Sequence, residues 1–305
     1  MSGPYTLYSD RLTARVDPDG ARLRDLRLDG GPNLVLDVDD GVSPALRDAY
    51  AGAIVGPVAN RVRGGRVPMG RRVYQMSCNE NGVTALHSGP DGLDRQVWRV
   101  TDHRPARLAL HVTLPDGHGG LPGTREIEAV YALESNALRL DILMTTDAPT
   151  PASIAHHPYW RVDPDHQLMI HADTYLPTDA ENLPTGDIVH VGGTALDHRT
   201  PRPIATGTDH NFCVGATRRD APADVAELRT GTHVLRIAST EPGLQAYSGA
   251  FLPDLPAASI GPLAGIALEP QGWPDAVNHP DFPDVIVTPD HPYVQITTYT
   301  LHHAT

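Results

Sequence analysis

The sequence predicts an all-β protein, a sandwich or barrel with very little helix, and three observations support this. Apolar and polar residues alternate along several segments, which is typical of strands with one buried face. The 305 residues include 28 glycines and 29 prolines, which divide the chain into short segments separated by turns. Only one segment carries a fair helix start. Many short strands with frequent turns are typical of sandwiches and barrels.

The one expected helix begins after Ser43. Ser43 is a suitable N-cap residue. Pro44 suits the first helical turn, where its fixed φ angle and missing N–H group are tolerated. We expect the helix to end before Gly52, because glycine commonly terminates helices.

Three later segments show the strand alternation most clearly. The apolar residues that share a face are Leu108, Leu110, Val112 and Leu114, then Leu138, Leu140, Ile142 and Met144, and finally Val294 and Ile296. Arg139 and Asp141 take the opposite face of the second segment. Because successive side chains point to opposite faces of a strand, we expect each apolar set to face the core.

Composition limits the domain organisation and the partners. A chain of 305 residues could hold two domains, but large β-sandwiches are often single, and neither a linker-like segment nor an internal repeat interrupts the sequence. We therefore expect one domain over residues 1–305. The formal net charge is −13, and an acidic surface repels nucleic acid and anionic membranes. Neither is an expected partner, and the sequence leaves monomer and homodimer open.

The chain contains no lysine, since all 24 basic residues are arginine. This excludes Schiff-base chemistry, pyridoxal phosphate attachment and a P-loop lysine. Cys78 and Cys213 form no metal or redox motif, as expected in a reducing compartment. The N-terminal residues lack a signal-peptide pattern, and no apolar stretch approaches the ~18 residues of a membrane span. We expect a cytoplasmic location.

The segment from Gly265 to Ala276 is the most informative part of the chain. Its short apolar strand predicts that Glu269 lies at a strand end, followed by Gln271, Gly272 and Trp273 in a proline-rich turn. A carboxylate can handle hydroxyl protons, and an aromatic ring can cover the C–H face of a sugar. The segment therefore suggests a sugar site, although a surface glutamate in a proline-rich loop fits the spacing as well.

Six stretches of the sequence belong together: Gly56–Val62, Leu86–Asp94, His156–Trp160, Thr208–Phe212, Leu244–Gly249 and Leu268–Asn278. In this order they resemble the aldose 1-epimerase (galactose mutarotase) family, and the last resembles the family motif Leu-Glu-Thr-Gln-x-Phe-Pro-Asp-Ala-x-Asn. Each segment alone is a weak signal, but six in the same order are strong.

The resemblance implies a fold and a reaction. The fold is a large antiparallel β-supersandwich with a cleft on one sheet face. The reaction interconverts the α and β anomers of a free aldose by general acid–base ring opening and closure, without a cofactor. By position in the motifs, Glu269 is the base and His157 the acid.

The sequence departs from the family pattern around the proposed acid. His156 stands where the family usually has asparagine, and Pro158 replaces a hydroxyl residue. Proline biases the preceding residue toward extended geometry, which suits His157, but His156 remains an alternative acid. A neighbouring carboxylate, Glu269 or Asp209, would raise the pKa of His157, so we expect a raised value.

The resemblance also implies a set of hydroxyl-binding residues. They are Asn60, Arg61, His87, Tyr159, Asp209 and Gln245. Arg61 and Asp209 could instead form a structural ion pair, and Trp273 could be core rather than sugar platform. Further histidines could in principle bind a metal, but no metal-binding spacing occurs, so we expect none.

Three other functions remain open at this point. A hexose-6-phosphate mutarotase would need an additional cationic cluster, which the sequence does not place near the site. A non-catalytic sugar-binding protein would not need both Glu269 and His157. A biosynthetic enzyme on the same scaffold is kept open by His156 and Pro158.

Overall fold

The computed structural model describes residues 3–37 and 43–304 and is built almost entirely of β-strands. Within those two ranges, every pairing between named strands is antiparallel. The all-β prediction is therefore confirmed. No helix in this part of the chain is long and apolar enough to cross a membrane.

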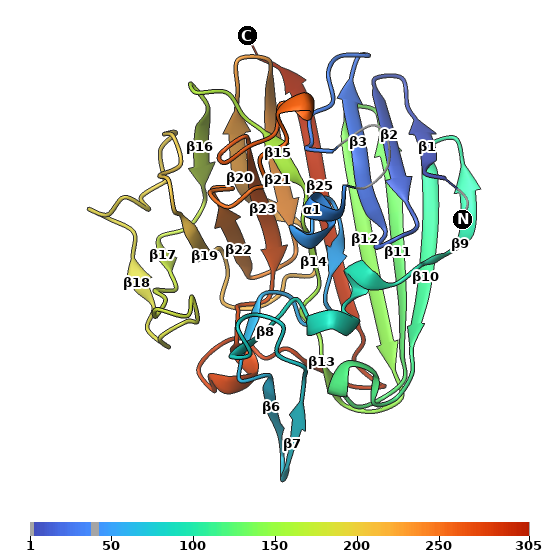
Figure 1. Ribbon diagram of the computed structural model, residues 1–305, viewed down its shortest axis with the longest axis vertical. Coiled ribbons are helices and arrows are strands. Elements are labelled where there is room, and N and C mark those ends of the chain that lie inside the picture. Colours follow the sequence, from blue (N-terminus) through green and yellow to red (C-terminus); the bar gives the residue numbers. More distant parts are fainter. Residues whose placement is uncertain (1–2, 38–42, 305) are drawn as a thin grey trace.

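One eight-stranded sheet forms the back of the molecule (Figure 1). Its strands, in spatial order, are β16 (Gln167–Ile170), β20 (Ala223–Arg229), β21 (His233–Ser239), β25 (Tyr293–His303), β12 (Ala137–Thr146), β11 (Arg125–Glu134), β10 (Arg107–Leu114) and β9 (Arg99–Arg104).

Two further sheets pack on this one. The six-stranded sheet has the order β15 (Tyr159–Arg161), β23 (Gly265–Gln271), β22 (Gly243–Tyr247), β19 (Asp209–Cys213), β17 (Thr174–Tyr175) and β18 (Val189–His190). The three-stranded sheet contains β1 (Tyr5–Tyr8), β2 (Leu12–Asp17) and β3 (Arg22–Leu28). A large apolar cluster joins residues of all three sheets into one core.

Four two-stranded ribbons complete the architecture. They are β4 (Ile54–Val55) with β14 (Ala155–His156), β5 (Arg61–Arg63) with β8 (Thr84–Leu86), β6 (Arg66–Met69) with β7 (Arg72–Gln75), and β13 (Thr150–Pro151) with β24 (Ile286–Val287). The β6–β7 hairpin projects from the body of the molecule (Figure 1).

The expected helix is present and short. α1 spans Pro44–Asp48 and follows Ser43, so its start and its end before Gly52 are confirmed. The Ser43 side chain, however, makes no capping hydrogen bond within the described residues. α1 is the only α-helix in the described part of the chain, which also contains five short 3-10 helices.

Two of the three alternating segments bury the predicted face. Leu138, Leu140, Ile142 and Met144 of β12 are almost fully buried, whereas Arg139 and Asp141 are partly exposed. The predicted apolar residues of β10 are buried as well.

The third segment is a strand, but its predicted core face is wrong. Val294 on β25 is 46% exposed, and the buried side chains are those of the other face, among them Tyr293, Gln295 and Tyr299. Gln295 is tolerated inside because its Nε2 donates to the Pro270 carbonyl at 3.0 Å. Apolar character alone therefore predicted the wrong buried face for this strand.

The buried polar groups of β25 connect the large sheet to segments near Glu269 and His157. The Tyr293 hydroxyl accepts from the Ile154 N–H and donates to the Ile154 carbonyl, both at 3.1 Å. Gln295 holds Pro270, which follows Glu269. The Tyr299 hydroxyl lies 3.1 Å from His156 Nδ1.

Candidate active site

A pocket of about 340 Å³ on one face of the six-stranded sheet contains all eight residues predicted from the sequence. These are Asn60, Arg61, His87, His157, Tyr159, Asp209, Gln245 and Glu269. Six other side chains with polar or aromatic groups also line it, and the sequence reasoning did not nominate them. They are Asp48, Tyr50, Glu80, Asn182, Tyr247 and Phe251.

Strand register explains why three of these residues meet. Gln245 on β22 lies directly opposite Glu269 on β23 and Asn211 on β19. Asp209 stands two residues before Asn211, so its side chain shares the same sheet face. The alternate residues, such as Leu244 and Leu268, belong to the apolar core on the other face. One face of this sheet therefore builds the pocket, and the other builds the core.

Glu269 lies inside β23 rather than at a strand end, because the strand continues to Gln271. Its side chain is 2% exposed, and Oε1 lies 3.5 Å from His157 Nε2. Oε2 is buried without a hydrogen-bond partner in the described structure. Burial raises the pKa of Glu269 well above its ordinary value, and the charge of Asp209 adds to this effect.

His157 follows β14, and its backbone N–H donates to the Ala53 carbonyl at 2.9 Å. Its ring lies against the rings of Tyr159 and His87, with centroid distances of 5.0 and 5.4 Å. Burial lowers the pKa of His157 to about 4. The raised pKa expected from a neighbouring carboxylate is therefore wrong, because desolvation by burial is the largest influence on the ring.

His156 points the other way, since successive residues of a strand face opposite sides. Its ring packs against Tyr131 and Tyr299 in the core, with centroid distances of 5.7 Å to each. Among the residues described as lining the pocket, His157 is present and His156 is not. The geometry thus favours His157 over His156 as the acid.

His87 is held as a hydrogen-bond donor. The backbone N–H of Asn60 donates to His87 Nδ1 at 3.1 Å, so a neutral ring carries its proton on Nε2. The backbones of Asn60 and His87 have positive φ angles of 62° and 51°, which bring the two residues together. Burial lowers the pKa of His87 well below its ordinary value, which keeps the ring neutral.

His87, His157 and Glu269 also lie close enough to be considered as metal ligands. Each offers one ligand atom, and these atoms lie within 4.8 Å of one another. However, a metal at His87 Nε2 would need the lone pair at the position that carries the proton. The bond from Asn60 therefore suits hydrogen bonding to a polar substrate rather than metal ligation.

Arg61 and Asp209 form an ion pair inside the pocket, which is the alternative to hydroxyl binding that the sequence left open. Arg61 Nη1 lies 3.4 Å from Asp209 Oδ2, and Gln245 Nε2 donates to Asp209 Oδ1 at 2.6 Å. Arg61 also donates through Nε and Nη2 to both oxygens of Glu80, each at 2.8 Å. The pair belongs to a network whose members all line the pocket.

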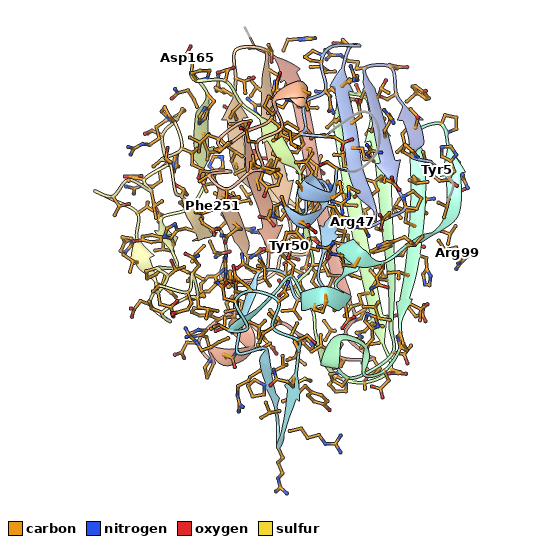
Figure 2. All side chains as sticks on the ribbon, in the orientation of Figure 1. Tyr5, Arg47, Tyr50, Arg99, Asp165 and Phe251 are labelled. Carbon is orange, nitrogen blue, oxygen red and sulfur yellow. The ribbon has the colours of Figure 1, made fainter. Side chains whose placement is uncertain are left out.

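Trp273 belongs to the core. It packs with Leu176 and Phe282, and its Nε1–H donates to the Pro242 carbonyl at 3.0 Å. The aromatic group at the pocket mouth is instead Phe251, which is 90% exposed. Figure 2 shows Phe251 and Tyr50 on the same face of the molecule. Phe251 follows the Leu244–Gly249 segment by two residues, so that segment could have pointed to it.

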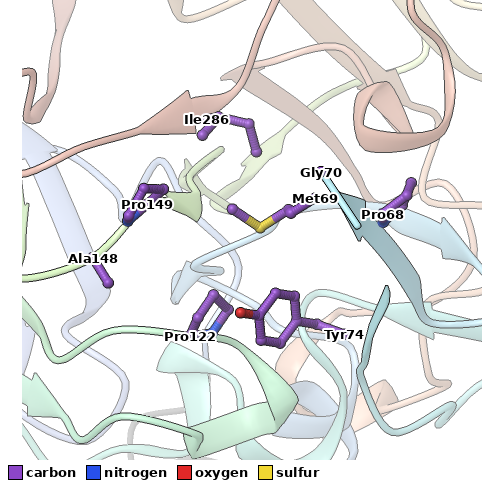
Figure 3. Close-up of a pocket in the computed structure, with 8 residues that line it drawn as sticks. All are labelled: Pro68, Met69, Gly70, Tyr74, Pro122, Ala148, Pro149 and Ile286. Carbon is purple, nitrogen blue, oxygen red and sulfur yellow. The ribbon is translucent and has the colours of Figure 1, made fainter. Parts of the chain in front are cut away.

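A larger hollow of about 520 Å³ lies beside the projecting hairpin (Figure 3). Met69 and Tyr74 of the hairpin face Pro122, Pro149 and Ile286 across it. Its described lining contains no carboxylate or imidazole. The smaller pocket is the candidate active site, because it holds the buried acid–base pair.

Comparisons with known proteins agree with this geometry. Residues 4–300 match the family model described as aldose 1-epimerase. Galactose mutarotase from Bos taurus is 32% identical over 304 residues, covering 91% of this chain and 87% of the relative. Aldose 1-epimerase from Escherichia coli is 31% identical, covering 77% and 74%. The crystal structure of an aldose epimerase homologue from C. elegans covers 100% of both chains, with a TM-score of 0.90 and 27% identity.

Proposed function

Because the chain belongs to the aldose 1-epimerase family, we propose that it interconverts the α and β anomers of a free aldose at the pocket around Glu269 and His157. The observation that carries this proposal is the pair itself. His157 Nε2 and Glu269 Oε1 lie 3.5 Å apart, both nearly buried, in a pocket lined by hydroxyl-binding side chains. Ring opening needs only such a pair.

The pair holds one proton, which burial keeps on Glu269 at rest. Ring opening begins when this proton passes from Glu269 Oε1 to His157 Nε2, 3.5 Å away. Glu269 accepts the proton of the C1 hydroxyl while His157 donates its proton to the ring oxygen, so the C1–O5 bond breaks and an aldehyde forms. Rotation about C1–C2 exposes the other carbonyl face. Closure reverses both transfers and restores the pair. Each transfer partner typically contributes about 10²–10⁴-fold to the rate.

The remaining pocket residues are proposed as hydroxyl partners. Arg61, Asn60 and the Nε2–H of His87 supply donors, and Asp209 supplies acceptor oxygens. Gln245 holds Asp209 from the neighbouring strand. Tyr159 lies beside His157 and limits the space around it.

The charge of the pocket favours a neutral sugar over a sugar phosphate. Arg61 is the only arginine among its described lining residues, and it is already bound to Glu80 and Asp209. Four carboxylates line the same pocket: Asp48, Glu80, Asp209 and Glu269. The additional cationic cluster that a phosphate needs is not found among these residues.

Polarimetry tests the proposal directly. Freshly dissolved α-D-glucose, α-D-galactose and L-arabinose should each be followed with and without the protein. Faster mutarotation of at least one free aldose is the expected result. Unchanged rates for all three would leave a non-catalytic sugar-binding protein or a biosynthetic enzyme as the better interpretation.

We also propose a cytoplasmic location. Cys78 and Cys213 are both free thiols, and unpaired cysteines are usual where thiols stay reduced. Fractionation of the native host cells would test this proposal, and recovery of the protein outside the cytoplasm would contradict it.

A further inference from the structure

Glu80 is the residue of the pocket that most constrains Arg61, yet the sequence reasoning did not nominate it. It lies between β7 and β8, where Asn81 and Gly82 turn the chain with φ angles of 51° and 68°. Its two oxygens accept from Arg61 Nε and Nη2, each at 2.8 Å. The Thr84 hydroxyl donates to Glu80 Oε2 at 2.6 Å and fixes the carboxylate.

The Arg61 guanidinium keeps two N–H groups free to bind a substrate. A guanidinium has five N–H groups. Two of those of Arg61 bind Glu80, and one reaches Asp209 Oδ2 at 3.4 Å. One N–H on each terminal nitrogen stays available for a ligand, and the bidentate contact fixes the plane in which they lie.

The charges of Arg61 and its two partners do not cancel. Arg61 is shared between two carboxylates, Glu80 and Asp209, so the three groups together carry a negative charge. Burial keeps the neighbouring rings of His87 and His157 neutral by lowering their pKa values. A neutral sugar meets oriented donors and acceptors here, whereas a sugar with its own negative charge meets uncompensated carboxylates.

We propose that Glu80 is a specificity-determining residue, which orients Arg61 for neutral hydroxyls and excludes anionic sugars from the pocket. This inference rests on the proposed function, because it assumes that the pocket binds aldoses. Glu80 acts through Arg61 and is therefore a positioning residue. Its charge adds the discrimination against anions.

The test compares E80Q with the parent enzyme on neutral and anionic sugars. D-galactose is the neutral substrate, and D-galacturonate and D-glucose 6-phosphate are the anionic competitors. In E80Q we expect the inhibition constants of both anions, relative to the KM for galactose, to improve about tenfold. The KM for galactose should rise a few-fold, because Arg61 loses half of its bidentate partner, while kcat changes little.

Two further variants separate charge from orientation. T84V removes the hydroxyl that fixes Glu80 but keeps its charge, so it should raise the KM for galactose without improving the binding of anions. E126Q is the matched control, because Glu126 on β11 also accepts a threonine hydroxyl, from Thr113 at 2.7 Å, and contacts a basic ring, His111, at 2.8 Å. E126Q should match the parent in every constant.

Calorimetric titration with galactose and galacturonate measures the affinity for each sugar without relying on catalysis. If the parent fails to accelerate mutarotation but E80Q still improves galacturonate binding relative to galactose, the proposed function fails and this inference stands. If galactose turns over and E80Q leaves the ratio of anionic to neutral affinity unchanged, the inference is overturned. Should E80Q fail to fold, the absence of a KM increase in T84V would count against the orienting role.

Discussion

Burial determines how many protons the Glu269–His157 pair binds. Removing a carboxyl group and an imidazole from water favours the neutral form of each, so the pKa of Glu269 rises and that of His157 falls to about 4. The two shifts favour a pair that holds one proton over the range between them. In that state the proton rests on Glu269, and it must pass to His157 Nε2, 3.5 Å from Oε1, before Glu269 can accept a proton and His157 can donate one.

Glu269→Gln should lose about two to four orders of magnitude in the rate of mutarotation. The amide keeps the shape of the side chain but cannot accept the C1 hydroxyl proton. Polarimetry measures the rate, and an unchanged circular dichroism spectrum and melting temperature show that the fold is intact. A variant that keeps more than about a tenth of the parent rate would place the base elsewhere.

His157 should not titrate near its ordinary pKa. Because burial lowers its pKa to about 4, the ring should stay neutral as the pH falls from 8 to 5, and the acid limb of kcat/KM should lie well below pH 6.5. The His157 C2 proton resonance, assigned by comparison with His157→Asn, measures this directly. A midpoint at pH 6 or above would contradict the burial argument.

The residues of the site differ in how far the sequence could reveal them. Motif position identified the eight predicted residues, because each stands in a segment shared with the family. Glu80 stands in a turn between short strands and became visible only when folding brought it to Arg61. Trp273 and Phe251 show the same limit, since sequence cannot tell which aromatic ring faces solvent.

At the scale of elements, β25 links the large sheet to the active site through polar groups on its buried face. Tyr293 binds the backbone of Ile154, which precedes His157 in the chain. Gln295 binds the carbonyl of Pro270, the residue after Glu269. Glu269 lies on β23 whereas His157 follows β14, so a common support fixes their separation. The alternation of β25 was predicted correctly, but its buried face carries partnered polar groups that a hydrophobicity rule sends to solvent.

Tyr293→Phe should lower the free energy of unfolding by about 1–3 kcal/mol, because it leaves the buried N–H and C=O groups of Ile154 without their hydroxyl partner. Urea denaturation measures this loss. We also expect a lower kcat, since Ile154 precedes β14 and His157. The matched control is Tyr8→Phe at an exposed tyrosine of β1, and equal stability of the two variants would refute the supporting role of Tyr293.

At the scale of the whole molecule, strand periodicity and turn composition were enough to predict the all-β class, but not the arrangement of the sheets. The eight-stranded sheet places β25 between β21 and β12, which lie far apart in the sequence. Such long-range pairings follow from packing rather than from local patterns. The prediction of one domain stays a prediction, and a single cooperative unfolding transition would support it.

Buried neutral histidines should make the whole fold sensitive to acid. Burial lowers the pKa of His156 to about 3, whereas the unfolded chain should titrate near the ordinary value of about 6.5. Between these values the unfolded state binds more protons, so stability is fully present above pH 6.5 and falls as the pH drops. The slope is about 1.4 kcal/mol per pH unit for each such histidine.

His156→Asn removes one of these groups and leaves a side chain that can still bond the Tyr299 hydroxyl. Relative to the variant, the parent should therefore lose about 2–3 kcal/mol between pH 6.5 and 4.5. Urea midpoints at half-unit pH steps measure the difference, and His302→Asn at an exposed histidine provides the control. The control should run parallel to the parent, because the His302 side chain is exposed. Parallel curves for His156→Asn as well would show that His156 becomes protonated in the folded protein near its ordinary pKa, against the burial that its position between Tyr131 and Tyr299 imposes.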